Sequence, residues 1–314
     1  MPEGEDAALA ALIPRIGRLH LRQRLGMERD HEARRMRRTA DVHSQDMAAT
    51  LQIVVRLGLR VTGLHARGRR NARRIVVRRH EVALAHLPHA FDGFTLLQLS
   101  DLHIDAALGF TAALIDALQN LDYDLCVLTG DYRARTFGPH DAALAELTEL
   151  RPHLKGPAYA VLGNHDTIRL VPPMEAMGYR FLLNENIAIE RADASIYLAG
   201  IEDAHYYHLD DFSRATEGIP EGAASILLSH TPEAYRHAAH ADFDLMLSGH
   251  THGGQICLPG GTPLLTARAP RRIVRGSWRH HGMIGYTASG SGTSIVDARL
   301  NCPPEVTLHV LRRG

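Results

Sequence analysis

The stretch Thr95-Leu-Leu-Gln-Leu-Ser-Asp-Leu-His103 is a short apolar run that stops at two residues able to bind a metal, Asp101 and His103. Four later runs stop in the same way: Leu125–Thr129 before Gly130-Asp131, Tyr159–Leu162 before Gly163-Asn164-His165-Asp166, Ser225–Leu228 before Ser229-His230, and Leu245–Leu247 before Ser248-Gly249-His250-Thr251-His252. Ligands of α/β sheets bind outside the carboxyl ends of strands. The five stops together therefore predict one two-metal site.

From about residue 80 the chain alternates short β runs with helical segments, which implies α/β layering. We predict helices at Thr111–Leu121, His140–Leu150 and Pro232–Ala239. Asp203–Gly222 and Gln255–Gly282 look like loops. Both follow candidate ligands, so both are placed to line a substrate pocket.

Charge divides the chain into two parts. The formal net charge is zero, yet residues 1–79 carry 18 arginines against 8 acids, and residues 80–314 carry 17 basic residues against 27 acids. We therefore predict a basic, mainly helical N-terminal extension at 1–79 and a catalytic domain at 80–314. A basic arm suits an anionic partner, either a membrane surface or nucleic acid. An Arg-rich solvated helix explains the charge equally well.

Periodicity predicts two helices in the extension, over residues 5–40 and at about Asp46–Ala66. The second helix is amphipathic, with an apolar face of Val54, Leu57, Val61 and Leu64 and a basic face of Arg56, Arg60 and Arg67. Two interpretations stay open. Residues 46–79 lie on a membrane surface, or the helix packs against the catalytic domain or a second subunit.

Cysteine usage and the N-terminus bear on localisation. The three cysteines, Cys126, Cys257 and Cys302, are odd in number and widely spaced, which indicates no disulfide framework. The N-terminus lacks the features of a secretory signal peptide, and no stretch approaches the roughly 18 apolar residues that span a bilayer. These features favour a reducing cytoplasm, with any membrane contact peripheral and on the inner face.

The order of the five motifs is more specific than any one of them. Asp-x-His, Gly-Asp, Gly-Asn-His-Asp, His and Gly-His-Thr-His in this order resemble the calcineurin-like metallophosphoesterase superfamily over about residues 90–312. The resemblance implies a four-layer α/β/β/α sandwich, with two mixed β-sheets flanked by helices. It also implies a hydrolase with two divalent metal ions, one held by Asp101, His103 and His252, the other by Asn164, His230 and His250, with Asp131 bridging them.

The types of donor atom also indicate a two-metal site, independently of the resemblance. Oxygen and imidazole donors with no thiolate suit Mn, Fe or Zn, and we expect Mn, with Zn and Fe as alternatives. A bridging carboxylate such as Asp131 offsets the repulsion between two adjacent dications. The ions would lower the pKa of bound water towards about 7, so that a nucleophile for phosphodiester or pyrophosphate hydrolysis exists at neutral pH.

His165 stands beside the expected ligand Asn164 without being needed as a ligand itself. In the enzymes that the chain resembles, this histidine contacts the phosphate and is proposed to protonate the leaving oxygen, while the next acid, here Asp166, orients the ring. General acid catalysis of this kind is worth about 10²–10⁴-fold. The alternative is an imidazole that only binds phosphate.

A finer resemblance is to a bacterial branch of the superfamily, whose signature segments occur here at Leu99–His103, Leu228–Glu233, Ser248–Gln255, Gly290–Ser294 and Pro303–Glu305. Members of this branch are phosphodiesterases. Some look like UDP-2,3-diacylglucosamine pyrophosphatases of lipid A synthesis, often attached to the membrane by their N-termini. The resemblance makes UDP-2,3-diacylglucosamine the leading substrate, met at the cytoplasmic face of a membrane by the basic arm.

Substrate contacts are expected from loops beside the ligands. Arginines there can bind a second phosphate or a uridine diphosphate group through forked hydrogen bonds; the candidates are Arg133, Arg268, Arg271, Arg272 and Arg275. In the cluster His205–His208, His205 and Tyr206 are candidates to meet the substrate, with Tyr206 stacking a base or covering an acyl chain. Each of these residues can equally be a solvated charge or part of a packed loop.

Two other functions stay open. A nucleotide phosphodiesterase or nuclease would explain the basic arm, although residues 15–79 show no recognised nucleic-acid motif and little aromatic interleaving. A non-catalytic scaffold of the same fold is the other alternative. Such scaffolds have lost ligands, whereas the ligand set here is intact.

Overall fold

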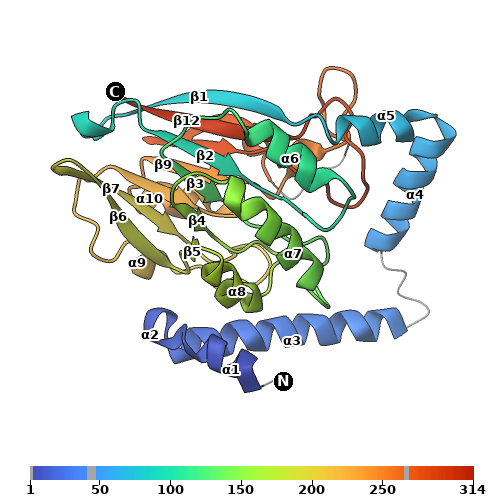
Figure 1. Ribbon diagram of the computed structural model, residues 1–314, viewed down its shortest axis with the longest axis horizontal. Coiled ribbons are helices and arrows are strands. Elements are labelled where there is room, and N and C mark those ends of the chain that lie inside the picture. The colour runs from blue at the N-terminus through green and yellow to red at the C-terminus, as the bar shows by residue number, and fades with distance from the viewer. Residues whose placement is uncertain (1–2, 41–46, 265–268) are drawn as a thin grey trace.

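The computed structural model describes residues 3–40, 47–264 and 269–314. It contains two six-stranded sheets (Figure 1). The first sheet has the order β1 (Val76–Leu84), β12 (Glu305–Arg313), β2 (Thr95–Leu99), β3 (Leu125–Leu128), β4 (Ala158–Ala160) and β5 (Tyr179–Phe181). The second has the order β10 (Gly276–His280), β11 (Met283–Thr287), β9 (Leu245–Ser248), β8 (Ser225–Leu228), β7 (Ala194–Gly200) and β6 (Glu185–Arg191).

Both sheets are mixed, with a parallel centre. Strands β2 to β5 are parallel to one another, and β12 runs antiparallel to β2. In the second sheet β7, β8, β9 and β11 are parallel, while β6 and β10 are antiparallel edge strands. Because parallel strands end at the same edge, the loops after β2, β3 and β4 leave the first sheet together, as do those after β8 and β9 in the second.

Alternation along the strands builds three apolar layers. In β2, Leu97 and Leu99 belong to the core under the helices α6 (Phe110–Leu118), α7 (Asp141–Leu150) and α8 (Val171–Ala176). Leu96 points the other way, into the core between the two sheets. A third cluster joins the second sheet to α9 (Phe212–Ala215) and α10 (Tyr235–His240). The predicted four-layer α/β/β/α sandwich is confirmed.

The predicted helices of the catalytic domain lie within a few residues of their observed positions. The third prediction, Pro232–Ala239, corresponds to a 3₁₀ turn, η4 (Pro232–Ala234), followed by α10. The two predicted loops are partly regular. The first contains α9, and the second contains the 3₁₀ turn η6 (Arg271–Ile273) and the edge strand β10.

In the described part of the N-terminal extension, residues 3–40 and 47–79, the chain forms five helices in place of the two predicted: α1 (Glu3–Ala10), α2 (Ile13–Ile16), α3 (Arg18–Ala40), α4 (Met47–Val61) and α5 (Leu64–Asn71). The chain turns at Gly17 (φ 83°) and at Gly63 (φ 70°), and this left-handed backbone suits glycine. Helix α3 runs along one side of the body, and α4 and α5 lie at the end of the sheets where β1 begins (Figure 1).

The extension is packed into the body. Leu9, Leu12, Ile16 and Leu21 are buried in the same core cluster as α6, α7 and α8. Each such side chain contributes about 1.5–3 kcal/mol on burial. β1 begins at Val76, so the first sheet already includes the last four residues of the predicted extension. Within the described residues, none of the helices combines the length and apolar character that crossing a membrane requires.

Candidate metal centre

The loops after five parallel strands bring the predicted ligands together. Asp101 and His103 follow β2, Asp131 follows β3, and Asn164 follows β4. His230 follows β8, and both His250 and His252 follow β9. The first three strands belong to one sheet and the last two to the other. The site therefore lies where the two sheets end side by side.

Five of the seven predicted ligands have left-handed backbone, which is uncommon for residues other than glycine. Their φ angles are 51° at Asp101, 37° at His103, 59° at Asp131, 69° at His250 and 51° at His252. Such conformations cost of order 1–3 kcal/mol each, and they gather at functional sites. Here they turn consecutive donor side chains towards one point.

Two glycines are required by close packing around the ligands. A Cβ on Gly163 would overlap the Asp131 carboxylate, and a Cβ on Gly249 would overlap the Ser100 hydroxyl and the Asp101 carboxylate. The space that these glycines leave lets the Ser100 hydroxyl donate to Asp101 Oδ2 at 2.6 Å. It also lets the His250 N–H donate to Asp101 Oδ1 at 2.9 Å.

The donors form two clusters that share one oxygen. In the first, His252 Nε2 lies 3.1 Å from His103 Nε2 and 3.4 Å from Asp101 Oδ1. In the second, His230 Nε2 lies 3.0 Å from Asn164 Oδ1 and 3.3 Å from His250 Nδ1. Asp131 Oδ2 lies 3.6 Å from His103 Nε2 and 3.3 Å from His230 Nε2. One carboxylate oxygen therefore approaches both clusters, as the predicted bridge requires.

Backbone carbonyls behind two of the rings fix their tautomers. His103 Nδ1 donates to the Arg133 carbonyl at 2.9 Å, and His230 Nδ1 donates to the Thr129 carbonyl at 2.8 Å. With Nδ1 donating to a carbonyl, Nε2 of each ring is the nitrogen that faces the centre, where a bound metal would take its lone pair. Arg299, which is fully buried, donates to the His252 carbonyl at 3.1 Å and so holds the last ligand loop.

The charges fit cations. Burial lowers the pKa of His103 to about 4 and that of His250 to about 3, so both rings are neutral ligands near pH 7. Burial alone would raise the pKa of Asp131, but nearby histidines hold it well below its ordinary value. Burial alone would lower the pKa of His230, but Asp131 raises it to about 10. Protonated His230 thus balances the negative charge of Asp131, as a bound metal ion would do in its place.

Oxygen and imidazole donors in these two groups suit divalent metals. Asp101, His103 and His252 would hold one ion, and Asn164, His230 and His250 the other, with Asp131 between them. Such ions bind phosphate oxygens and activate water.

His165 lies beside the clusters with one ring nitrogen already used. Its Nδ1 donates to the Ala134 carbonyl at 3.0 Å, and its backbone N–H donates to Asp131 Oδ1 at 2.8 Å. The ring packs edge-on against His103, with centroids 4.9 Å apart, and lines the cavity above the ligands. The second ring nitrogen, Nε2, is therefore the one available to a phosphate ester.

Asp166 does not orient the His165 ring, contrary to the prediction. Its carboxylate accepts from three backbone N–H groups, those of Asp131 (2.7 Å), Gly163 (2.8 Å) and Tyr132 (2.9 Å). These bonds tie the loop after β3 to the loop after β4. The Ala134 carbonyl orients the ring instead.

Arg133 is also a positioning residue, where a substrate contact was predicted. It is buried, and its guanidinium donates to the carbonyls of His165 (2.7 Å), Gly138 (2.9 Å) and Thr136. With its donors used in this way, it holds the loops on either side of His165. The position of Arg133 beside the Gly130-Asp131 motif gave no sign of this supporting role, because the three carbonyls come together only in the fold.

Three of the other predicted substrate contacts have protein partners as well. His205 forms an ion pair with Glu233 (3.3 Å), and Tyr206 packs edge-on against His31 of α3 with centroids 4.4 Å apart. Arg272 donates to the Tyr235 hydroxyl at 3.0 Å. Arg271 lies exposed on η6, and Arg268 lies outside the described residues. None of these described residues, nor the further candidate Arg275, is among the described residues that line the cavity at the ligands.

That cavity has a volume of about 950 Å³ and apolar walls. Its floor includes Asp131, Asn164, His165, His250 and His252. Its walls come from α4 and α5 and from the loops at residues 254–264 and 294–301, with Val55, Leu59, Leu64, Ile256, Leu258 and Val296 among the lining side chains. The amphipathic pattern predicted the helix, but nothing in the sequence placed it over the ligands.

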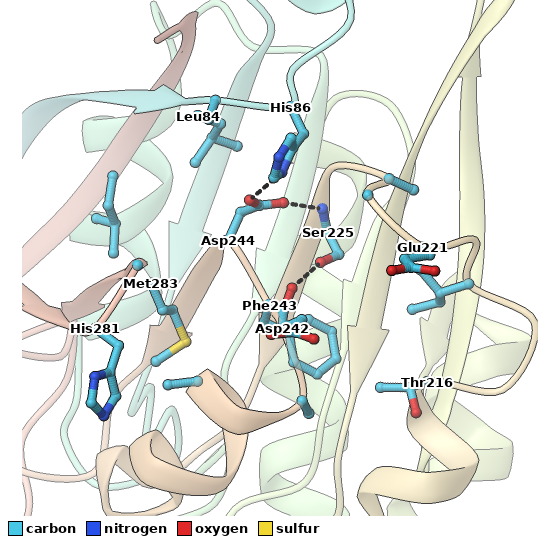
Figure 2. Close-up of a pocket in the computed structure, with 18 of the residues that line it drawn as sticks. Leu84, His86, Thr216, Glu221, Ser225, Asp242, Phe243, Asp244, His281 and Met283 are labelled. Atoms are coloured by element: carbon cyan, nitrogen blue, oxygen red, sulfur yellow. Dashed lines mark hydrogen bonds and ion pairs between the residues drawn. The ribbon is translucent and has the colours of Figure 1, made fainter.

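A second groove, of about 920 Å³, lies at the other ends of the strands (Figure 2). It is lined by the first residues of β8 and β11, Ser225 and Met283, and by Leu84 at the end of β1. His86 pairs there with Asp244 at 3.2 Å, and Asp244 accepts from the Ser225 N–H at 2.9 Å (Figure 2). These contacts tie loops at the edge away from the metal ligands.

Helix α3 supports the loop that carries His165. Arg24 is fully buried, pairs with Glu28 (3.0 Å) and Glu202 (3.1 Å), and donates to the Asp166 carbonyl at 2.8 Å. Glu28 accepts from the Ile168 N–H at 2.8 Å and from the Thr167 hydroxyl at 2.7 Å. The N-terminal extension thus reaches the loop behind the site.

Comparison with known proteins agrees with this geometry. The family model described as calcineurin-like phosphoesterase matches residues 94–254, which include every predicted ligand. The uncharacterized metallophosphoesterase YkuE of Bacillus subtilis (strain 168) is 30% identical over 244 residues, covering 74% of this chain and 84% of YkuE.

Two further bacterial relatives extend the comparison. The uncharacterized metallophosphoesterase YkoQ of the same Bacillus subtilis strain is 30% identical over 225 residues, covering 68% of this chain and 82% of YkoQ. Phosphodiesterase YaeI of Escherichia coli (strain K12) is 28% identical over 230 residues, covering 68% of this chain and 81% of YaeI.

Proposed function

Because the chain belongs to the calcineurin-like phosphoesterase family, we propose that it hydrolyses a phosphodiester or pyrophosphate bond with two divalent metals held at the ligands described above. The observation that carries this proposal is the position of Asp131 Oδ2, within 3.6 Å of a donor in each cluster. Two metals bridged in this way would activate water and neutralise phosphate oxygens.

The protein's own residues supply the remaining parts of the reaction. Asp131, through Oδ1, fixes the backbone of His165, and the Ala134 carbonyl holds the proton on His165 Nδ1. A protonated Nε2 would then face the ester and give its proton to the leaving oxygen. Arg133 and Asp166 keep the two loops in register so that this nitrogen stays over the clusters.

For the metals we propose Mn, with Zn and Fe as alternatives, because nitrogen and oxygen donors without thiolate suit all three. Elemental analysis of protein purified without chelator measures which metal is carried. Reloading the stripped protein with each metal then identifies the one that restores turnover. Two equivalents of Mn with full turnover are expected; restoration by Zn or Fe but not Mn would replace this assignment.

For the substrate we propose an amphiphile, with UDP-2,3-diacylglucosamine of lipid A synthesis as the leading compound. The cavity over the metal ligands is walled by aliphatic side chains such as Val55, Leu59 and Ile256, and acyl chains suit such walls. A polar nucleotide alone would leave these side chains in contact with water.

A turnover panel with the Mn-loaded enzyme tests this substrate. It compares UDP-2,3-diacylglucosamine, UDP-N-acetylglucosamine without acyl chains, cyclic nucleotides and an aryl phosphodiester, with Asp131→Ala as the blank. We expect kcat/KM for the diacyl compound to exceed the others by at least about 10²-fold, since each buried methylene contributes about 0.8 kcal/mol. Equal rates with and without acyl chains would refute the amphiphile, and preference for a cyclic nucleotide would favour a nucleotide phosphodiesterase.

We further propose that α4 and α5 contact an anionic membrane at the cytoplasmic face. Residues 47–80 contain nine arginines and no acid, and Ile53, Leu57 and Val61 are exposed along one face of α4 at 66%, 58% and 79%. An apolar face flanked by arginines is the pattern of helices that lie in a bilayer surface.

Co-sedimentation with vesicles measures this contact. We expect binding to vesicles with anionic lipid, weak binding to neutral vesicles, and loss of binding in the double variant Leu57→Glu, Val61→Glu. Unchanged sedimentation of the variant would contradict a contact through α4, and binding to duplex or single-stranded nucleic acid in place of vesicles would favour a nuclease. The variant's turnover of a water-soluble aryl phosphodiester checks that the metal centre is intact.

A further inference from the structure

The two ring nitrogens of His250 have different surroundings. Its Nδ1 faces the second cluster, 3.3 Å from His230 Nε2. Its Nε2 is buried and has no hydrogen-bond partner among the described residues. A neutral imidazole that binds a metal through one nitrogen carries its proton on the other, and a buried N–H without an acceptor costs about 1–3 kcal/mol. The ring therefore requires a hydrogen-bond acceptor close to Nε2.

Glu233 supplies a carboxylate on that side. It lies in η4, three residues after the ligand His230, so the same turn that presents one ligand also presents this acid. Both of its carboxylate oxygens are buried without a hydrogen-bond partner among the described residues. Donor atoms of Glu233, His250 and His205 lie within 4.8 Å of one another. The carboxylate of Glu233 is therefore the acidic group of this three-residue cluster, beside the His250 ring.

His205 holds the acid from the other side. Its Nδ1 lies 3.3 Å from Glu233 Oε1, an ion-pair distance without the alignment of a hydrogen bond. Its ring packs against the ring of His250 with centroids 4.8 Å apart. His205 comes from the loop after β7, so the acid stands between two histidines from separate loops.

We propose that Glu233, held by His205, accepts a hydrogen bond from His250 Nε2 and thereby orients Nδ1 as a ligand of the second metal. The inference rests on the proposed two-metal function. It makes Glu233 and His205 positioning residues, and it gives the acid of the Leu228–Glu233 segment a role that its sequence motif did not reveal. Loss of such an outer partner weakens metal binding by about 10–100-fold.

Metal retention measures this role without any substrate. Wild type and the variants Glu233→Ala, Glu233→Gln and His205→Ala are loaded with Mn and dialysed against graded chelator, and the metal bound per chain is measured. Glu221→Gln, in the exposed loop at the other end of the strands, is the control. Melting temperatures without metal report whether each variant folds.

We expect wild type and the control to retain two metals to the same chelator concentration. Glu233→Ala should release one of the two at about 10–100-fold less chelator and keep the other as wild type does. Glu233→Gln, whose amide oxygen still accepts a hydrogen bond, should fall between them, and His205→Ala should show the smaller loss.

Two outcomes would overturn the proposal. Retention of both metals by Glu233→Ala at wild-type affinity means that the acid does not support His250. Three metals in wild type and two in Glu233→Ala mean that His205, Glu233 and His250 form a further metal site instead. Failure of wild type to bind two metals would count against the proposed function itself, so the two failures are distinguishable.

Discussion

At the scale of single residues, the site depends on side chains whose two polar atoms serve different partners. Asp131 offers Oδ2 to both donor clusters and uses Oδ1 to accept from the backbone of His165. His103 and His230 each give Nδ1 to a carbonyl and turn Nε2 to the centre. Each of these three side chains is thus held by a second contact, which preorganises its donor atom.

Replacing Asp131 with Ala should remove bound metal and turnover together. The side chain is the shared ligand, so its loss should weaken metal binding by more than the about 10–100-fold expected for an outer partner. Elemental analysis after dialysis and turnover of an aryl phosphodiester measure the two effects. A variant that keeps full turnover would show that the bridge has been assigned to the wrong residue.

Replacing His165 with Gln should leave both metals in place and lower kcat by about 10²–10⁴-fold. The ring is outside the two donor clusters, but its Nε2 is the nitrogen left for the leaving oxygen. A substrate with a good leaving group needs less protonation, so its kcat should fall least. Equal losses for good and poor leaving groups would favour an imidazole that only binds phosphate.

At the scale of elements, the N-terminal helices belong to the catalytic unit in two different ways. Helix α3 braces the loop at Asp166–Ile168 through Arg24 and Glu28, which are both buried. Helix α4 instead walls the cavity with Val55 and Leu59 on one side. A truncation of the extension would therefore disturb the loop behind the metals as well as the cavity wall.

Replacing Glu28 with Gln should lower the free energy of unfolding by about 3–5 kcal/mol, because it leaves the buried Arg24 with less compensating charge. The neighbouring loop should also shift, with a fall in kcat. Denaturant unfolding measures the first effect and a steady-state assay the second. Asp30→Asn, at an exposed position of the same helix, is the matched control. Equal stability of the two variants would contradict the brace.

At the scale of the whole molecule, the two sheets bury histidines beyond the metal ligands. His309 of β12 is fully buried, with Nε2 2.9 Å from Gln98 Oε1 and Nδ1 3.0 Å from His80 Nδ1. Burial, together with His80, holds the pKa of His309 well below 6.5, and burial lowers the pKa of His80. His309 and His80 therefore stay unprotonated in the native fold at pH values at which the same side chains bind a proton in the unfolded chain.

This burial predicts a loss of stability in acid. Below about pH 6.5 the unfolded chain binds a proton at residue 309 that the native chain does not, so stability falls as the pH falls towards the lower native pKa. His309→Gln should remove up to about 1.4 kcal/mol per pH unit from that dependence. Unfolding is measured from pH 7 to 5 with metal in excess, against His153→Gln, an exposed histidine, as control. Parallel curves for wild type and His309→Gln would contradict the prediction.

Much of the site could be predicted because each ligand is specified locally. An apolar run, a glycine and a donor such as Asp131 make a strand, a turn and a ligand within about six residues. Parallel strands then deliver their ends to one edge whatever the rest of the chain does. The same locality explains why the helix positions α6, α7 and α10 were close to the predicted ones.

The sequence by itself thus determined the fold class and the seven donor residues that the structure brings together, since both follow from short-range patterns. Only the tertiary structure decided what the remaining polar residues do. Arg24 and Glu202 are 178 positions apart, and Glu28 and Ile168 are 140 apart. The physical reason is that a charged side chain takes its role from whichever groups are buried beside it, and those neighbours are set by packing between distant segments. Packing between distant segments made Arg133 and Asp166 supports of the loops. The same packing placed α4 at the wall of the cavity.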